Sequence, residues 1–114
     1  MGMSKKEHIV IRVNATDFGI PMSFDQWLNR GRRWWKTRAD RALNADRLFV
    51  IDATNRVRAV GLVDGVLKDR EDGSDRVSIE VTSEEDSELI GKIIRRNDSR
   101  NPISYVTTIE VVDQ

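Results

Sequence analysis

The sequence predicts an α+β domain: a small, curved, mixed β-sheet or partial barrel with two or three short helices packed against it. About five short segments are β-branched or alternate polar with apolar residues, as strands do. The two clearest helix-capping patterns both lie between the first and second of these segments. The resulting order, strand-helix-helix followed by strands, is not the regular alternation of a doubly wound sheet.

The first part of the chain predicts one strand and two helices. Residues 7–13 are β-branched and indicate a buried strand. Residues 23–26 (Ser-Phe-Asp-Gln) form a capping-box pattern, so we expect a helix over residues 24–30, with Gly31 as its C-terminal stop. Thr37, followed three residues later by Asp40, resembles a second cap and predicts a brief helix to about residue 44.

The middle of the chain predicts a hairpin and a further strand. Residues 47–53 indicate a central strand, and a turn at Thr54 and Asn55 leads into a return strand over residues 56–64. Gly61, inside the return strand, indicates either a bulge or a close approach by another backbone or a ligand. Residues 76–82 alternate cleanly, which predicts a strand with one solvated face.

The last third is less regular. Residues 83–86 can cap a helix whose apolar side chains face inward, although Gly91 weakens the helix and a strand is the alternative. Those apolar residues are Leu89, Ile90, Ile93 and Ile94. Residues 97–102 predict a loop, and residues 105–112 are β-branched and alternating, as expected of a final strand.

Composition limits the class of protein. A chain of 114 residues has the size of one domain, which we expect over residues 7–114, after a disordered or added N-terminal segment at residues 1–6. No apolar run approaches the length of a membrane span, so no membrane partner is expected. The absence of cysteine removes disulfide and zinc-thiolate chemistry and favours an intracellular, cytoplasmic protein.

The charges cancel overall but are segregated along the chain. Nineteen basic residues balance nineteen acidic ones. Residues 30–41 nevertheless contain six basic residues and one acid, residues 69–88 contain nine acids and two arginines, and residues 92–100 contain four basic residues and one acid. A neutral total can therefore conceal a basic face, although a solvated surface of ion pairs is the alternative explanation.

The sequence offers little to catalysis, so we expect a protein that is not an enzyme and has no cofactor. The only histidine, His8, lies within the first predicted strand, where a catalytic acid/base role is unpromising. No phosphate-binding glycine loop or histidine-based zinc motif occurs. The acids of residues 69–75 do not have the spacing of a calcium-binding loop, and no metal site is predicted.

Trp34 and Trp35 are the most informative pair. They lie among arginines and a lysine, and aromatic faces between cations suit nucleic acid, because bases stack on the rings while cations hold phosphates. Burial in the core is the alternative. Adjacent residues of an extended segment point to opposite sides, so we expect one tryptophan to be buried and the other to line a pocket. Trp27, at helical spacing from Phe24 and Leu28, is expected in the core.

The order of these segments resembles the PUA-like superfamily, and within it the YTH and EVE domains. The resemblance is carried by the tryptophan link with Arg38 four residues after Trp34, by residues 47–64 with their tight turn and central Gly61, and by the proline-containing residues 94–104. It covers nearly the whole chain. YTH domains bind N6-methyladenine in an aromatic cage, and EVE and related domains bind modified bases that include modified cytosines.

The resemblance implies a pocket for a modified base that is flipped out of its DNA or RNA strand. The residues implied in the pocket are Trp34, Trp35, Asn14, Asp17, Thr37, Arg38 and Leu67. Leu67 stands in a loop that carries a second cage tryptophan in YTH domains, and would supply an apolar wall instead. The residues available for phosphates are Arg12, Arg32, Arg33, Lys36, Lys92, Arg95, Arg96 and Arg100.

The resemblance further implies a sensor in a defence or restriction system, with a nuclease or motor domain in the same chain or in a partner chain. The main alternative is a protein-interaction or assembly module that uses the tryptophans and arginines as an interface, where both residue types are enriched. A PUA-like enzyme or small-molecule binder is the third hypothesis.

Overall fold

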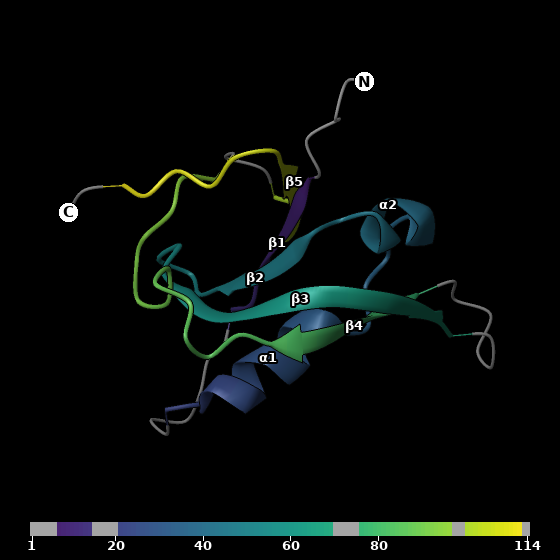
Figure 1. Ribbon diagram of the computed structural model, residues 1–114, viewed down its shortest axis with the longest axis horizontal. Coiled ribbons are helices and arrows are strands. Elements are labelled where there is room, and N and C mark those ends of the chain that lie inside the picture. The colour runs from purple at the N-terminus through teal and green to yellow at the C-terminus, as the bar shows by residue number, and fades with distance from the viewer. Residues whose placement is uncertain (1–6, 15–20, 70–75, 97–99, 113–114) are drawn as a thin grey trace.

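The computed structural model describes residues 7–14, 21–69, 76–96 and 100–112 (Figure 1). It contains one five-stranded mixed sheet with two short helices packed against it, and the sheet is not closed into a barrel. The elements in chain order are β1 (His8–Arg12), α1 (Phe24–Arg32), α2 (Ala39–Leu43), β2 (Arg47–Ile51), β3 (Val57–Lys68), β4 (Val77–Ser83) and β5 (Ile103–Val106). The predicted α+β class with two helices is therefore confirmed. Among the described residues, no helix has the length and apolar character to span a membrane.

The strands lie in the order β4-β3-β2-β1-β5, so the first two strands of the chain are internal. β1 and β2 pair in parallel, with Val10 opposite Phe49, and the other neighbouring pairs are antiparallel. A parallel pair needs a crossover connection, which here contains α1 and α2. β2 is buried without interruption from its second residue on, as expected of a strand that is covered on both faces.

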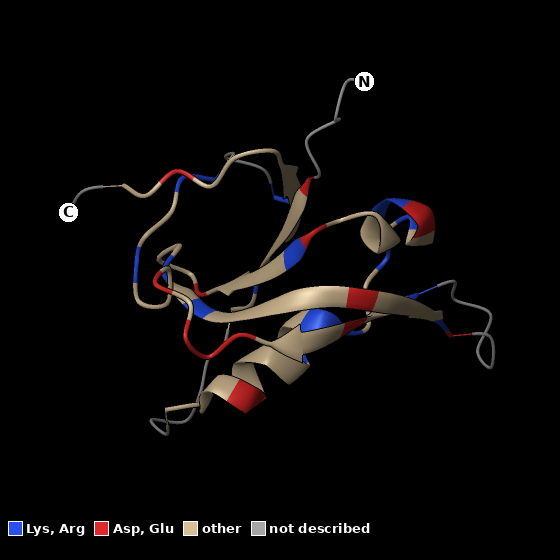
Figure 2. Ribbon diagram, in the orientation of Figure 1, with Lys and Arg blue, Asp and Glu red and all other residues tan. Residues whose placement is uncertain are grey.

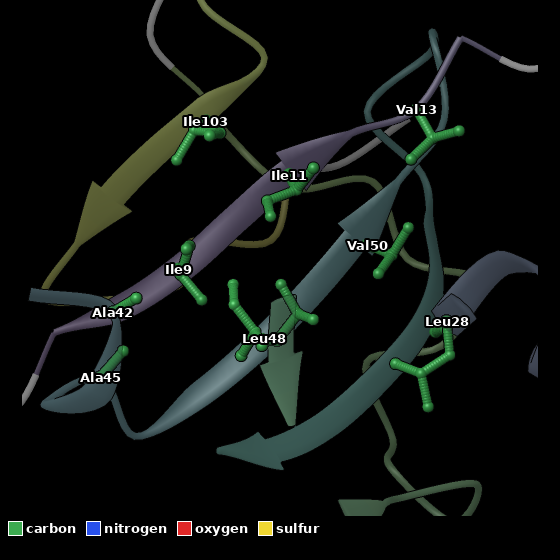
Figure 3. Close-up of a cluster of buried hydrophobic side chains, with 11 residues drawn as sticks. Ile9, Ile11, Val13, Leu28, Ala42, Ala45, Leu48, Val50 and Ile103 are labelled. Atoms are coloured by element: carbon green, nitrogen blue, oxygen red, sulfur yellow. The ribbon is translucent and has the colours of Figure 1, made fainter. Parts of the chain in front are cut away.

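The two faces of the sheet carry separate hydrophobic cores. Ile9, Ile11, Leu48 and Val50 point toward the helices, where they meet Leu28 of α1 (Figure 3). On the other face, Val10, Phe49, Ile51, Val57 and Val60 form a cluster with Ile94, Leu89 and Ile90. The helices thus cover one face, and the irregular chain that follows β4 covers the other (Figure 1).

α1 begins as predicted and ends later. The Ser23 hydroxyl accepts a hydrogen bond from the Gln26 amide (3.2 Å), while the Ser23 amide donates to Gln26 Oε1 (2.8 Å), which completes the capping box. The prediction that Gly31 stops the helix is wrong, because the helix continues through Arg32. Gly31 instead lies directly against Val50 of β2, in a position where a Cβ atom would overlap the valine side chain.

The cap predicted for α2 is also wrong. Arg38 is the N-cap residue, and no side chain caps the helix. The Thr37 hydroxyl lies 2.8 Å from the hydroxyl of Tyr105 in β5. Thr37 therefore joins the segment that precedes α2 to β5, at the edge of the sheet.

The hairpin is confirmed with shifted ends. Asp52 stabilises the turn, because one of its carboxylate oxygens accepts bonds from the Thr54 amide (2.8 Å) and the Thr54 hydroxyl (2.5 Å), and Asn55 adopts a φ of 67°. Gly61 is a close approach rather than a bulge, but to a side chain, since a Cβ atom there would come within 2.7 Å of the Val81 side chain. The register irregularities of β3 lie elsewhere: one between Val57 and Ala59, opposite β2, and one between Val63 and Gly65, opposite β4.

The segment after β4 contains turns rather than the helix or strand predicted from residue 83. Gly91 has a φ of 89°, which neither regular element adopts. Leu89, Ile90 and Ile94 nevertheless face inward as expected. The final strand spans Ile103–Val106 instead of residues 105–112, and beyond it a single bridge joins Val111 to Ile94. The predicted N-terminal segment 1–6 lies outside the described residues.

We expect Gly31→Ala to destabilise the protein by about 1 kcal/mol. Alanine ordinarily stabilises a helix interior relative to glycine by about 1 kcal/mol, but overpacking against Val50 costs about 1–3 kcal/mol. Urea denaturation measures the difference. The same substitution should cost less in a Val50→Ala background, because the overlapping methyl groups are then absent. A Gly31→Ala protein more stable than the wild type would contradict this packing.

His8 should make stability depend on pH. Burial lowers the pKa of His8 below its usual value, although Asp46 opposes this shift. Below about pH 6.5 the unfolded chain therefore binds a proton that the folded chain resists, and the free energy of unfolding falls as the pH decreases. We expect a smaller loss in His8→Gln between pH 7.5 and pH 5.5, measured by denaturation at both values. Equal losses in the two proteins would show that His8 does not contribute.

Candidate nucleic-acid interface

Residues 33–38, which we call the link, connect α1 to α2 and are held by Trp35. The Trp35 amide donates to the Val77 carbonyl (3.0 Å), and the Val77 amide donates to the Trp35 carbonyl (2.9 Å), so the link adds one bridge to the edge of β4. The Trp35 indole nitrogen donates to the Gly31 carbonyl (2.9 Å), and the ring packs against the helix-side core. Trp34 is more exposed, at 40%. The expectation that one tryptophan is buried and the other lines a pocket is met only in part, because Trp35 is partly buried and both residues line the hollow described next.

A hollow of about 450 Å³ lies beside the link, within the size range of ligand pockets. We call it the Trp34 hollow. Its lining residues are Arg12, Val13, Asn14, Arg30, Arg33, Trp34, Trp35 and Pro102. It brings together three residues predicted for the base pocket (Asn14, Trp34, Trp35) and two predicted for phosphates (Arg12, Arg33).

The walls of the Trp34 hollow are positively charged. Arg12, Arg30 and Arg33 line it, and no aspartate or glutamate is among its described lining residues. Arg96 lies behind Arg12 and is only 8% exposed. Burial, with the positive charge of Arg12 nearby, lowers the pKa of Arg96. An anion bound at Arg12 would therefore reduce a like-charge repulsion.

A second hollow of about 410 Å³, which we call the Tyr105 hollow, lies on the other side of Trp35 along the link. Its lining residues are Lys36, Thr37, Arg38, Arg41, Asn101, Ile103, Ser104 and Tyr105. The guanidinium carbon of Arg41 lies 4.1 Å from the centre of the Tyr105 ring. Burial raises the pKa of Tyr105, so its hydroxyl remains a neutral hydrogen-bonding group beside Thr37.

Two predicted pocket residues, Thr37 and Arg38, thus line the Tyr105 hollow and not the Trp34 hollow. Leu67 lines neither: it is an exposed residue of β3 (54%), paired with Ser78. Asp17 lies outside the described residues. The residues of the base pocket implied by the resemblance are therefore divided between two hollows, and the described aromatic residues that line the first are Trp34 and Trp35.

The residues predicted for phosphates separate in the same way. Arg32 is engaged within the fold, because its Nη1 lies 2.6 Å from Glu80 Oε2 and thereby joins α1 to β4. Lys92 lies on the segment that covers the second face of the sheet and lines neither hollow. Arg95 is exposed and pairs with Glu110 (3.0 Å). Arg96 is buried and donates to the carbonyl of Asn101. Arg100 is exposed and directly precedes Asn101, a lining residue of the Tyr105 hollow.

Sequence reasoning missed eight residues that line the two hollows: Val13, Arg30, Arg41, Asn101, Pro102, Ile103, Ser104 and Tyr105. Arg30 and Arg41 belong to the basic segment 30–41, whose composition was the available signal. Pro102 and Tyr105 carried no such signal, because β5 is brought to the link by its pairing with β1.

A larger hollow, of about 780 Å³, lies on the opposite face of the sheet beside His8 and Phe49. Its rim carries Glu84, Glu85, Asp86 and Glu88, and Glu84 pairs with Arg47 (2.7 Å). This excess of carboxylates repels phosphates, so size alone does not identify the nucleic-acid site.

Comparisons of the chain with protein-family models, with curated proteins and with solved structures give no match.

The two tryptophans should differ in their contribution to stability. We expect Trp35→Ala to lower the free energy of unfolding by about 3 kcal/mol, because it removes a ring that packs on the core. Trp34→Ala should change it by less than about 1 kcal/mol, since the ring is exposed. Urea denaturation followed by circular dichroism measures both. A loss in Trp34→Ala as large as that in Trp35→Ala would mean that both rings are structural.

Proposed function

We propose that this domain binds nucleic acid and accommodates an unstacked base in the Trp34 hollow. The observation that carries the proposal is an exposed indole surrounded by Arg12, Arg30 and Arg33 in a hollow without a described acidic lining residue. An aromatic face attracts the base, while the guanidinium groups attract the phosphates on either side of it. Figure 2 shows the same basic character on the link that leads into α2.

The energetics agree with a modest affinity. Stacking on one aromatic side chain contributes about 1–3 kcal/mol, whereas extruding a base from a duplex costs a few kcal/mol. One indole therefore compensates for the extrusion only in part, and phosphate contacts supply the remainder. Single-stranded or already unpaired targets avoid that cost, so they should bind more tightly than duplexes.

The resemblance to YTH and EVE domains supports a finer proposal: the base carries a modification, either N6-methyladenine or a modified cytosine. A methyl group enlarges the apolar edge of the base, and Val13, Trp34 and Pro102 supply apolar surface in the hollow. The side-chain amide of Asn14 can donate and accept hydrogen bonds at the polar edge of the base. We extend this proposal to a sensor role in a defence or restriction system, beside a nuclease or motor domain.

We assign binding rather than catalysis to this site. The described side chains that line the Trp34 hollow are arginines, an asparagine, tryptophans, a valine and a proline. None of these residue types is among the usual general acids and bases of enzymes.

A protein-interaction module is the second candidate, because an exposed tryptophan next to arginines is also typical of interface hot spots. The two functions differ in their dependence on salt. Nucleic-acid affinity falls steeply with salt as counterions are released, whereas an interface centred on a tryptophan responds weakly.

Fluorescence anisotropy with matched single-stranded oligonucleotides tests the proposal. The oligonucleotides carry adenine, N6-methyladenine, cytosine or 5-methylcytosine, as DNA and as RNA, and are titrated at two salt concentrations. We expect salt-dependent binding that Trp34→Ala weakens about 5- to 100-fold, the loss of one stacked base. Leu67→Ala, which changes an exposed apolar residue outside both hollows, is the control and should bind normally.

Each outcome is informative. If modified and unmodified oligonucleotides bind with equal affinity, nucleic-acid binding is supported but the finer proposal of a modified base is wrong. If no oligonucleotide binds even at low salt, the proposed function is wrong and the protein interface becomes the better explanation.

A further inference from the structure

We propose that the Tyr105 hollow is a second subsite, which holds the backbone phosphate next to the base in the Trp34 hollow. The ligand is then a nucleic-acid strand that crosses the link, with one nucleotide contacting both hollows. This inference rests on the proposed function and deepens it, since it selects Lys36 from the residues expected to contact phosphates and gives it a defined subsite with Tyr105.

Residues that are neighbours in the chain line the two hollows on two sides. Trp35 lines the first and Lys36, the next residue, lines the second. On the opposite side, Pro102 lines the first, while its neighbours Asn101 and Ile103 line the second. Consecutive Cα atoms are about 3.8 Å apart, so the backbone that borders one hollow lies within the length of a nucleotide of the backbone that borders the other.

The chemistry of the Tyr105 hollow suits a phosphate. It contains three cations, Lys36, Arg38 and Arg41, and no aspartate or glutamate among its described lining residues. It also contains three hydroxyl groups, those of Thr37, Ser104 and Tyr105. Hydroxyl and cationic donors are the groups that contact phosphate oxygens in protein–nucleic acid complexes.

The three cations differ in how free they are to bind. Lys36 forms no ion pair within the part of the chain that the structure describes, and it is exposed. Arg38 pairs with Asp40, but both side chains are largely exposed (77% and 66%), so exchanging that pair for a phosphate costs little. Arg41 is held in place by two bonds of 2.9 Å to Glu7 and by the ring of Tyr105. Lys36 is therefore the residue that we assign to direct contact with the phosphate.

An acidic peptide would also find cations here. The strand is favoured because the adjoining hollow combines an exposed indole with three further arginines, which matches a base flanked by phosphates. An acidic peptide has no base to stack on the exposed indole of the Trp34 hollow.

The experiment compares Lys36→Ala with Lys92→Ala. Both variants remove one exposed lysine, but Lys92 lies on the segment that covers the other face of the sheet. Binding is measured with single-stranded oligonucleotides in which one linkage, on the 5′ or the 3′ side of the central base, is an uncharged methylphosphonate. Each titration is repeated across a range of salt concentrations.

We expect Lys36→Ala to weaken binding about tenfold, the loss of one charge-assisted hydrogen bond, and to reduce the salt slope by about 0.7. Lys92→Ala should bind like the wild type. In the wild type, one of the two methylphosphonates should reproduce the effect of Lys36→Ala, and in Lys36→Ala the same methylphosphonate should have no further effect.

Other outcomes overturn the inference in distinguishable ways. If Lys36→Ala matches Lys92→Ala while Trp34→Ala still weakens binding, the Tyr105 hollow is not a subsite, although the proposed function stands. If the wild type binds no oligonucleotide, both proposals are wrong. An acidic peptide whose binding depends on Lys36, without oligonucleotide binding, would assign the hollow to a protein partner.

Discussion

The attachment of Trp35 is the constraint on which the candidate site depends. Its backbone bridges Val77 at the edge of β4, its indole nitrogen bonds to Gly31 at the end of α1, and its ring packs on the core. These contacts fix one residue of the link from three directions. Trp34, the preceding residue of the link, is 40% exposed. Trp35 therefore anchors the segment that carries the open indole.

The same constraint explains why Gly31 occupies the last turn of α1. The helix approaches β2 so closely that any side chain at this position would overlap Val50. A wider separation would move the Gly31 carbonyl away from the Trp35 indole nitrogen, which now lies 2.9 Å from it. The close packing of α1 on β2 therefore also determines where the link lies. A substitution that disturbs this packing should change both the stability of the core and the geometry of the Trp34 hollow.

Local chemistry made part of this structure predictable. The capping box at Ser23 and the turn stabilised by Asp52 depend on residues within four positions of each other, so the sequence indicated both. Gly31 was wrongly predicted as a stop because the reason for glycine there is Val50, which belongs to another element. Thr37 resembled a cap, but its hydroxyl partner is Tyr105, 68 residues away. The basic segment and the two tryptophans were identified, whereas the contribution of Pro102 and Tyr105 required the pairing of β5 with β1.

The net charge of zero conceals an uneven distribution of charged side chains among the hollows of the molecule. The hollow beside His8, on the face opposite the helices, has a rim of carboxylates, whereas the hollows along the link carry six arginine and lysine side chains. A chain with no net charge does not attract nucleic acid from a distance, yet opposite charges on separate faces orient the molecule as a strand approaches. Under the proposed function, such a domain would bind weakly to nucleic acid in general, because its acidic face would repel phosphates in most orientations. Affinity would then be concentrated at the link, where a base in the Trp34 hollow would bring its phosphates to the cations, and this arrangement would favour selectivity for the inserted base over indiscriminate binding.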